Sequence, residues 1–403
     1  MRILNVTQSY APFFEFGGPP VKVKALAEGM AKKGHEVTVL TADWGLPTRL
    51  ARLPNEPRAE ISPFGRRRRV NGVTAIYLAN WLHYHATSWN PALGRYLRAR
   101  LKEFDIVHIF GLYDLLGPRA AKECRKRGIP YLVEPIGMFV PIVRSVFLKR
   151  GYHYLWGREM LEGAAAIVVT SEQERAELLA GGISSDKVIL RRNGVDVPET
   201  MPERGSFRRA LKIADEDKLI LFLGRFSQKK SPDLLLRAFA GLPESSSQRG
   251  GAVHLAFIGP DESGMKSRLI HMGGELGVSG RVHFSPPLEG EAKWSAYRDA
   301  DIFVLPSQNE NFGNTAAEAV AAGIPVIVTE NCGIAPLLKG TAGLIIKHEE
   351  AELRNALQHL LEHEVVYKSL QQGCRDAMAN LGWDKPLDEM EYSYSTLARR
   401  GTA

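Results

Sequence analysis

Short apolar runs alternate with helical stretches along almost the whole chain, and this alternation constrains the fold more than any other feature. Residues 3–6 read as a strand, residues 21–33 as a helix and residues 36–41 as a second strand. The same pattern continues with apolar runs at 105–109, 130–134 and 166–170 and helical stretches at 115–127 and 172–179. Strands that alternate with helices predict a parallel sheet covered on both faces.

The alternation is interrupted by turn chemistry and a polar stretch near residues 193–198 and then starts again. The expected strands of the second series are 219–223, 254–258, 282–284, 302–305 and 326–328. A chain of 403 residues exceeds the size of one hydrophobic core, so we expect an α/β fold of two facing, Rossmann-like, doubly wound domains. The predicted domains are 1–197 and 198–383. The helical tail at 384–403 could pack on either domain, and the prediction places it on the first.

Ligands of open parallel sheets bind beyond the carboxyl ends of the strands, so two facing sheets predict an interdomain cleft. Two acidic residues follow one expected strand on that side. Glu310 lies in the loop after residues 302–305, and Glu318 lies in the first turns of a helix that starts near Asn314, whose side chain could cap it. Taken singly, Glu310 reads equally well as a solvated loop charge and Glu318 as an acid that complements the helix dipole.

Backbone N–H groups around Gly313 to Thr315 predict a phosphate site at the start of this helix. Arg225 and Lys230 share a loop after residues 219–223, where two fixed cations could stabilise a departing diphosphate without a metal. Two solvated basic residues are the alternative. Gly17 and Gly18 open the first helix and could bring a backbone N–H group to a phosphate, although this signal is weak alone.

The chain resembles glycosyltransferase family 4, which has the GT-B architecture, over nearly its whole length. The motifs that carry the resemblance are Phe16-Gly17-Gly18, Gly34-His35-Glu36-Val37, Asn193-Gly194-Val195-Asp196, Gly224-Arg225 with Lys230, and the pair Glu310 and Glu318. The resemblance implies a retaining, metal-independent transferase that uses a nucleotide diphosphate sugar. It also implies specific roles for the matching residues: Arg225, Lys230 and Glu310 are catalytic, and Gly17, Gly18, Asn311, Phe312, Gly313, Asn314, Thr315 and Glu318 join them in binding the donor.

One residue departs from the family pattern. Many members carry a histidine where Ile136 stands here, before Gly137, and an apolar side chain cannot donate a hydrogen bond to a sugar or an acceptor. Glu134 or His108 could substitute for it, so the predicted acceptor-side residues are His108, Glu134, Ile136 and Gly137. For His108 a structural role inside the domain is the alternative.

The acceptor is not identified by any motif. Residues 44–70 and 81–89 are irregular stretches expected on the acceptor side, and their aromatic residues could either stack on a sugar or pack internally. We expect a glycan, a lipid-linked intermediate or a small molecule as the acceptor and UDP as the nucleotide, with no cofactor, no metal and no nucleic acid partner. The rival functions are a catalytically silent sugar-nucleotide binding protein and a GT-B epimerase or phosphorylase.

The charge and the cysteines bear on location. The chain has a net charge of +7, and its densest basic run, Arg66 to Arg69, reads as a solvated loop, with contact to anionic lipid head groups or an anionic acceptor as the alternative. The N-terminal apolar run meets Gly and Pro too early to be a signal peptide. Three widely spaced cysteines suggest free thiols and a cytoplasmic protein. Peripheral contact with the inner face of the membrane is left open.

Overall fold

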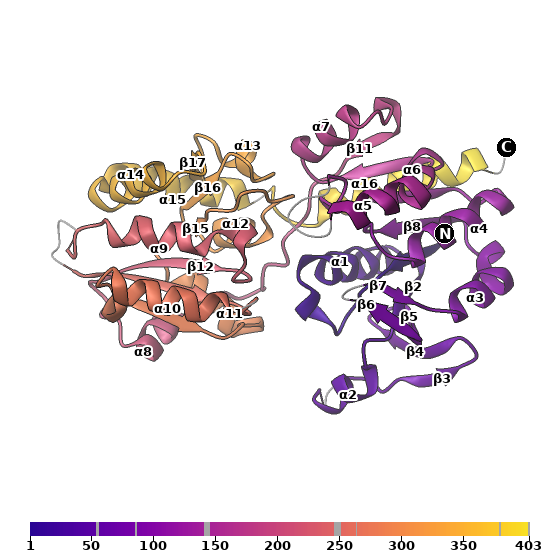
Figure 1. The fold of residues 1–403 in the computed structure, drawn as a ribbon, viewed down its shortest axis with the longest axis horizontal. Helices are drawn as coiled ribbons and strands as arrows, with labels where there is room; N and C mark the ends of the chain where they lie inside the picture. Colours follow the sequence, from indigo (N-terminus) through magenta and orange to yellow (C-terminus); the bar gives the residue numbers. More distant parts are fainter. Residues whose placement is uncertain are drawn as a thin grey trace. The chain divides into compact units, whose positions relative to one another are not determined.

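The computed structural model describes residues 1–53, 56–84, 87–140, 146–245, 251–262, 264–378 and 380–401. The chain divides into two compact units, shown in Figure 1. Unit 1 comprises Met1–Asn193 and Trp383–Ala403, and unit 2 comprises Gly194–Gly382. The boundaries expected from the sequence, after residues 197 and 383, lie close to these.

Unit 1 is built on a largely parallel sheet with the strand order β11-β10-β9-β8-β1-β2-β5-β4-β3. The strands are β1 (Arg2–Thr7), β2 (Glu36–Ala42), β3 (Glu60–Ser62), β4 (Gly65–Val70), β5 (Val73–Leu78), β8 (Ile106–Phe110), β9 (Tyr131–Glu134), β10 (Ala166–Val169) and β11 (Val188–Leu190). A separate antiparallel hairpin consists of β6 (Leu82–Tyr84) and β7 (Thr87–Trp89). The helices are α1 (Gly18–Lys32), α2 (Leu46–Ala51), α3 (Ala92–Arg100), α4 (Leu116–Arg127), α5 (Val146–Tyr152), α6 (Arg158–Glu162), α7 (Glu172–Ala180) and α16 (Asp384–Gly401).

Two apolar clusters cover the two faces of this sheet. One cluster is formed with side chains of α3, α4, α6 and α7, and the other with side chains of α1 and the C-terminal helix α16. Central strands such as β1 and β8 are buried on both faces, which explains why their sequences are almost continuously apolar. The predicted sheet, its covering helices and the helical tail are therefore confirmed.

Two sequence expectations for unit 1 were wrong. The run Arg66 to Arg69 belongs to strand β4, which pairs antiparallel with β5, and is not a loop. Arg68 is buried and bonds to Glu56 at 2.6 Å, while Arg66 lies 3.3 Å from Asp43. The stretches 44–70 and 81–89 are largely regular, because they contain α2, β3, β4 and the β6–β7 hairpin. The charged side chains of β4 face solvent or local partners, which hides this strand in a pattern read for apolar residues.

Unit 2 is a parallel sheet with the strand order β14-β13-β12-β15-β16-β17. The strands are β12 (Lys218–Leu223), β13 (Val253–Ile258), β14 (Val282–Ser285), β15 (Ile302–Leu305), β16 (Val326–Thr329) and β17 (Gly343–Ile346). The helices are α8 (Ser206–Leu211), α9 (Pro232–Ala240), α10 (Met265–Glu275), α11 (Gly290–Asp299), α12 (Asn314–Ala321), α13 (Ala335–Leu338), α14 (Glu350–Glu362) and α15 (Glu364–Met378). The five strands expected from the sequence are confirmed, and β17 was not predicted.

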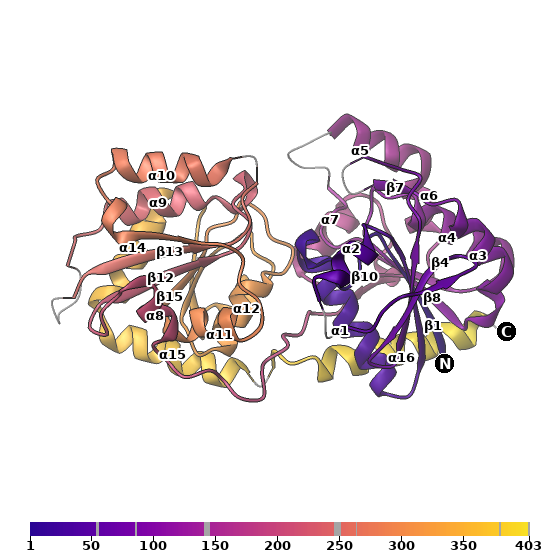
Figure 2. The same ribbon diagram turned by 90° about the horizontal axis from the view of Figure 1, so that it is seen from below.

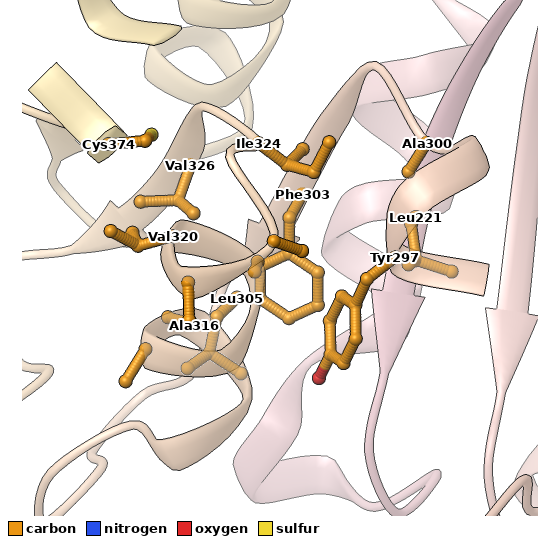
Figure 3. Close-up of a cluster of buried hydrophobic side chains, with 14 of the residues drawn as sticks. Leu221, Tyr297, Ala300, Phe303, Leu305, Ala316, Val320, Ile324, Val326 and Cys374 are labelled. Atoms are coloured by element: carbon orange, nitrogen blue, oxygen red, sulfur yellow. The ribbon is translucent and has the colours of Figure 1, made fainter. Parts of the chain in front are cut away.

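Helices α9 and α10 lie on one side of the unit 2 sheet, and α11, α12 and α15 lie on the other, as Figure 2 shows. The second face carries the cluster drawn in Figure 3, in which the ring of Tyr297 lies beside Phe303 with centroids 5.7 Å apart. This packing fixes α11 and α12 against β12 and β15. It therefore fixes the loops that leave the carboxyl ends of those two strands.

Candidate active site

The strand order of unit 2 reverses between β12 and β15. The chain proceeds from β12 to β13 and β14 on one side, and from β15 to β16 and β17 on the other. Two neighbouring loops diverge at such a reversal and leave a crevice beyond the carboxyl ends of the strands, where ligands of open α/β sheets bind. Arg225 and Lys230 follow β12, and Glu310 follows β15, so these predicted residues flank the reversal.

The side chains of Lys230 and Glu310 are in contact across this point, where the ammonium group of Lys230 donates a hydrogen bond to the Glu310 carboxylate. The backbone also joins the two loops, because Gln308 N donates to Lys229 O at 2.9 Å. Burial alone would raise the pKa of Glu310. The charge and hydrogen bond of Lys230, together with the charges of Lys229 and Arg225, instead hold the pKa of this carboxyl below its ordinary value. Glu310 is therefore an ionised acceptor at neutral pH.

The main chain of Glu310 is held from a third loop. Its N–H group donates to Asn331 O at 3.0 Å, and its carbonyl oxygen accepts from Gly333 N at 2.9 Å. These bonds pair Glu310 with Cys332 in an isolated parallel bridge. Glu310 is thus fixed by backbone as well as side-chain contacts, which suits a group that must be preorganised toward a ligand.

Helix α12 begins at Asn314 as the sequence predicts, but Asn314 is its first residue and not its cap. Gly313 occupies the N-cap position with φ +104°, a left-handed conformation that a residue with a side chain rarely adopts. The carbonyl oxygen of Gly313 accepts hydrogen bonds from Ala316 N and Ala317 N, both at 3.0 Å. The hydroxyl of Thr315, in the first turn, is buried and has no hydrogen-bond partner among the described residues. A buried hydroxyl without a partner is expected where a ligand supplies one.

Glu318 lies on α12 and is held by two residues that the sequence did not point to. Lys293 Nζ lies 2.9 Å from one carboxylate oxygen, and the Tyr297 hydroxyl donates to the other at 2.8 Å. Lys293 and Tyr297 are four residues apart on α11 and therefore share one face of that helix. Their spacing was visible in the sequence, but nothing in it indicated that this face meets Glu318.

Glu134, one of the predicted acceptor-side residues of unit 1, lies in a buried ionic cluster. Glu134 bonds to Lys22 at 2.7 Å and to Arg191 at 2.7 and 2.8 Å, and the side chains of all three are at most 3% exposed. The charges of Arg191 and Lys22 overcome the effect of burial and lower the pKa of Glu134 to about 2. Glu134 is therefore ionised and already satisfied by protein partners.

His108 lies beside this cluster and is fully buried. Its Nδ1 is hydrogen-bonded to the hydroxyl of Tyr394 on α16 at 2.7 Å, and its Nε2 lies 3.6 Å from Glu134. This environment is that of the structural histidine weighed as the alternative. Contact of His108 or Glu134 with an acceptor stays a prediction, and neither side chain is exposed in this structure.

Ile136 and Gly137 form the turn after β9. Ile136 has φ +56°, which is strained for a β-branched residue, and Gly137 has φ +68°. Gly137 N donates to Glu174 Oε1 at 2.5 Å, and the side chain of Ile136 packs against the apolar cluster shared by α1 and α16. Gly17 and Gly18 lie at the start of α1, also in unit 1.

Comparisons with known proteins agree with the two-unit description. Residues 17–194 match the Glycosyl transferase 4-like domain, and residues 203–377 match Glycosyl transferases group 1. Sucrose-phosphate synthase from Thermosynechococcus elongatus has a TM-score of 0.74 at 20% identity, over 98% of this chain and 99% of that chain. HepE from Anabaena, in complex with UDP-glucose, has a TM-score of 0.73 at 17% identity, over 98% and 100%. The fold is that of the GT-B class of glycosyltransferases.

Curated sequences that match the chain are also named glycosyltransferases. An uncharacterized glycosyltransferase of Methanocaldococcus jannaschii is 26% identical over 84% of this chain and 83% of its own length. A D-inositol 3-phosphate glycosyltransferase of Actinosynnema mirum is 32% identical, over 59% of each chain, so this chain spans less than two thirds of that relative. The chain is therefore similar to glycosyltransferases over most of its length, with the first unit matching the 4-like domain and the second unit matching group 1.

Three findings bear on metals, membranes and the cysteines. Among the described residues, no group of three or more His, Cys, Asp or Glu side chains is arranged to hold a metal ion. Within the same part of the chain, none of the helices combines the length and apolar character needed to cross a membrane. The three cysteines, Cys124, Cys332 and Cys374, are buried and unbridged.

Proposed function

We propose that the protein transfers a sugar from a UDP-sugar to a hydroxyl acceptor, with retention of anomeric configuration and without a metal. The observation that carries the proposal is the convergence of Arg225, Lys230 and Glu310 where the strand order of unit 2 reverses. Glu318 lies on α12, the helix that follows the loop of Glu310. A nucleotide diphosphate requires this combination, because its phosphates need cations and its ribose and sugar hydroxyls need acceptors. The complexes of HepE with UDP and with UDP-glucose support the choice of nucleotide.

Each residue has a defined part in this proposal. Arg225 and Lys230 bind the diphosphate and stabilise the charge that develops as its bond to the sugar breaks. Glu318, oriented by Lys293 and Tyr297, accepts the ribose hydroxyls. Glu310 and the amides that follow it contact the transferred sugar, and the first turn of α12 binds phosphate.

Retention follows if the leaving diphosphate deprotonates the acceptor hydroxyl on its own face of the sugar. The sugar then carries oxocarbenium character, and the protein needs no nucleophile at the anomeric carbon. The acceptor is a glycan, a lipid-linked intermediate or a small molecule bound by unit 1. NMR of the product tests the mechanism: the anomeric configuration of the donor should be kept, and an inverted product would exclude this route.

Replacing Lys230 tests the diphosphate assignment. Lys230→Ala should lower donor turnover and weaken UDP binding, because a charge-assisted contact to the leaving group is lost. The loss of transition-state stabilisation should be on the order of 2 to 4 kcal/mol. Lys368→Ala is the matched control, since this lysine is 68% exposed on α15 in the same unit. Normal turnover by Lys230→Ala would refute the assignment.

One observation favours a second candidate, a catalytically silent sugar-nucleotide binding protein. Ile136 packs into the apolar cluster of unit 1 and offers no polar group to a sugar. A silent binder would show UDP-sugar binding in a thermal-shift assay but neither hydrolysis nor transfer with any acceptor tested. Donor hydrolysis, even slow, would favour the transferase, whereas release of a free epimer or a sugar phosphate would identify an epimerase or a phosphorylase.

A further inference from the structure

A helical segment of unit 1 exposes large apolar side chains. It runs through α5, a π-helical turn (His153–Gly157) and α6. Phe147 is 87% exposed, Leu148 66%, Tyr154 89% and Leu155 56%. These four exposed residues are here called the apolar face.

The opposite side of the same segment is packed into unit 1. Tyr152, Met160 and Leu161 belong to the buried cluster beneath it. The Tyr113 hydroxyl lies 3.0 Å from His153 Nε2, and Lys149 Nζ lies 5.4 Å from the centroid of the Tyr113 ring. The segment is therefore anchored, and its exposed side is a fixed feature of unit 1.

The β6–β7 hairpin adds a second exposed apolar element next to the first. Thr87 Oγ1 donates to Tyr113 O at 2.7 Å, so the hairpin and the helical segment contact the same residue. On the hairpin, Trp81, Leu82 and Trp89 are all exposed. Exposed apolar side chains on two elements that contact the same residue mark a site of interaction with a protein or a membrane.

The charge distribution selects between these partners. Unit 1 contains 32 Lys and Arg against 21 Asp and Glu, whereas unit 2 contains 20 against 24, so their formal charges are +11 and −4. The net charge of +7 is thus concentrated in the unit that carries the apolar face. Two copies of unit 1 would repel each other, while an anionic surface would attract either copy.

We propose that the apolar face and the adjacent hairpin dock unit 1 on an anionic lipid surface. Phenylalanine, leucine, tyrosine and tryptophan suit the boundary between head groups and acyl chains, and the basic unit supplies the attraction to anionic lipid. Arg150 is exposed between Leu148 and Tyr154 and provides a local cation. The protein lies on the surface and does not span it. This proposal is independent of the donor assignment in unit 2.

Co-sedimentation of the full chain with vesicles tests the proposal. The protein should bind vesicles of phosphatidylcholine mixed with phosphatidylglycerol, bind phosphatidylcholine alone much more weakly, and release from the mixed vesicles as salt is raised. The double variant Phe147→Ser, Leu155→Ser should bind the mixed vesicles at least about tenfold more weakly, because two large apolar side chains no longer enter the lipid.

The matched control is the double variant Ile61→Ser, Tyr392→Ser, which removes two exposed apolar side chains from elsewhere in unit 1 and should bind vesicles like the unmodified protein. Circular dichroism spectra and thermal unfolding midpoints like those of the unmodified protein show that both variants are folded. The proposal is overturned if the unmodified protein ignores anionic vesicles, binds neutral vesicles equally well, or is not weakened by the Phe147 and Leu155 changes. It is also overturned if light scattering shows a dimer that only this variant dissociates, because the face would then join two copies of the chain.

Discussion

Tyr297 links the apolar interior of unit 2 to the candidate ribose site. Its ring packs beside Phe303 in the cluster of Figure 3, and its hydroxyl donates to Glu318. Burial and the neighbouring Glu318 charge raise the pKa of Tyr297 well above its ordinary value, so the hydroxyl keeps its proton and remains a donor. The carboxylate is oriented by a residue whose own position is set by core packing.

Tyr297→Phe should therefore weaken UDP binding by several-fold to about tenfold, which corresponds to about 1 kcal/mol for one lost hydrogen bond. Isothermal titration with UDP measures the effect. Tyr131→Phe is the control, since it removes a buried hydroxyl that bonds to Met160 O at 2.9 Å in unit 1. An equal loss of affinity in both variants would mean that Tyr297 acts on general stability and not on Glu318.

The free energy of unfolding should depend on pH through the protonation of His108. Burial lowers the pKa of His108 to about 3, although Glu134 opposes this effect, while Arg191 and Lys22 add to it. The folded protein therefore keeps His108 neutral below the ordinary pKa of 6.5, at which the unfolded chain takes up a proton. The stabilising contribution is complete above about pH 6.5 and declines as the pH falls toward 3.

Between about pH 6.5 and pH 5 the expected decline is about 2 kcal/mol, because each pH unit is worth about 1.4 kcal/mol. Urea unfolding of the unmodified protein and of His108→Gln at several pH values measures it, with the difference between the two proteins isolating this residue from other groups. A difference that does not change with pH would show that His108 is not the responsible group.

The sequence pointed to the candidate donor residues but not to the residues that contact them. Glu310 and Glu318 could be predicted because their chemistry, their spacing and their strand-loop-helix context all occur within one short segment. Lys293 and Tyr297 come from a different helix, and only the packing of α11 against α12 brings them to Glu318. In the same way, Lys22 and Arg191 reach Glu134 from distant parts of the sequence.

At the level of elements, the loop that carries Arg225 depends on a close backbone approach between β12 and β13. Gly259 follows β13 with φ +151°, and a Cβ atom there would lie 1.9 Å from Gly224 O. Gly224 N in turn donates to Ile258 O at 2.9 Å, so this backbone cannot retreat without losing a sheet bond. The residue after Gly224 is Arg225.

Gly259→Ala should destabilise unit 2 by about 1 to 3 kcal/mol or more, because it adds a steric clash to an unfavourable backbone conformation, and it should weaken UDP binding. Thermal unfolding with and without UDP measures both effects. Gly277→Ala separates the two causes, since Gly277 has φ +69° but nothing within 4 Å of an added Cβ. Similar losses in the two variants would contradict a role for the close approach.

Most strands near the centres of the two sheets were predictable, whereas β4 and the β6–β7 hairpin were not. Strands such as β1, β12 and β15 are short, almost fully apolar runs followed by turns, which is the pattern that a parallel sheet requires. Strand β4 is hidden by four consecutive arginines, and the β6–β7 hairpin by its short strands. Their structure depends on pairing with neighbours and not on an internal pattern.

At the scale of the whole molecule, the two units differ in continuity. Unit 2 is one uninterrupted stretch, Gly194–Gly382, and contains the proposed diphosphate and ribose residues. A fragment of residues 194–382 should therefore fold by itself and bind UDP, with an affinity within about tenfold of the full chain if unit 1 contributes one or two backbone contacts. Circular dichroism and titration with UDP test this expectation. A folded fragment that does not bind UDP would show that the site needs unit 1.

Unit 1 is completed only by α16, which lies beyond unit 2 in the chain. Met390 and Tyr394 of this helix are fully buried in the cluster shared with α1. During synthesis from the N-terminus, residues 1–193 emerge first but wait for their last helix until unit 2 has been made. The apolar groove beside α1 is uncovered throughout that interval. We therefore expect a released chain that ends at residue 382 to hold a folded second unit and an unfinished first unit that binds chaperones, although the first unit was translated earlier.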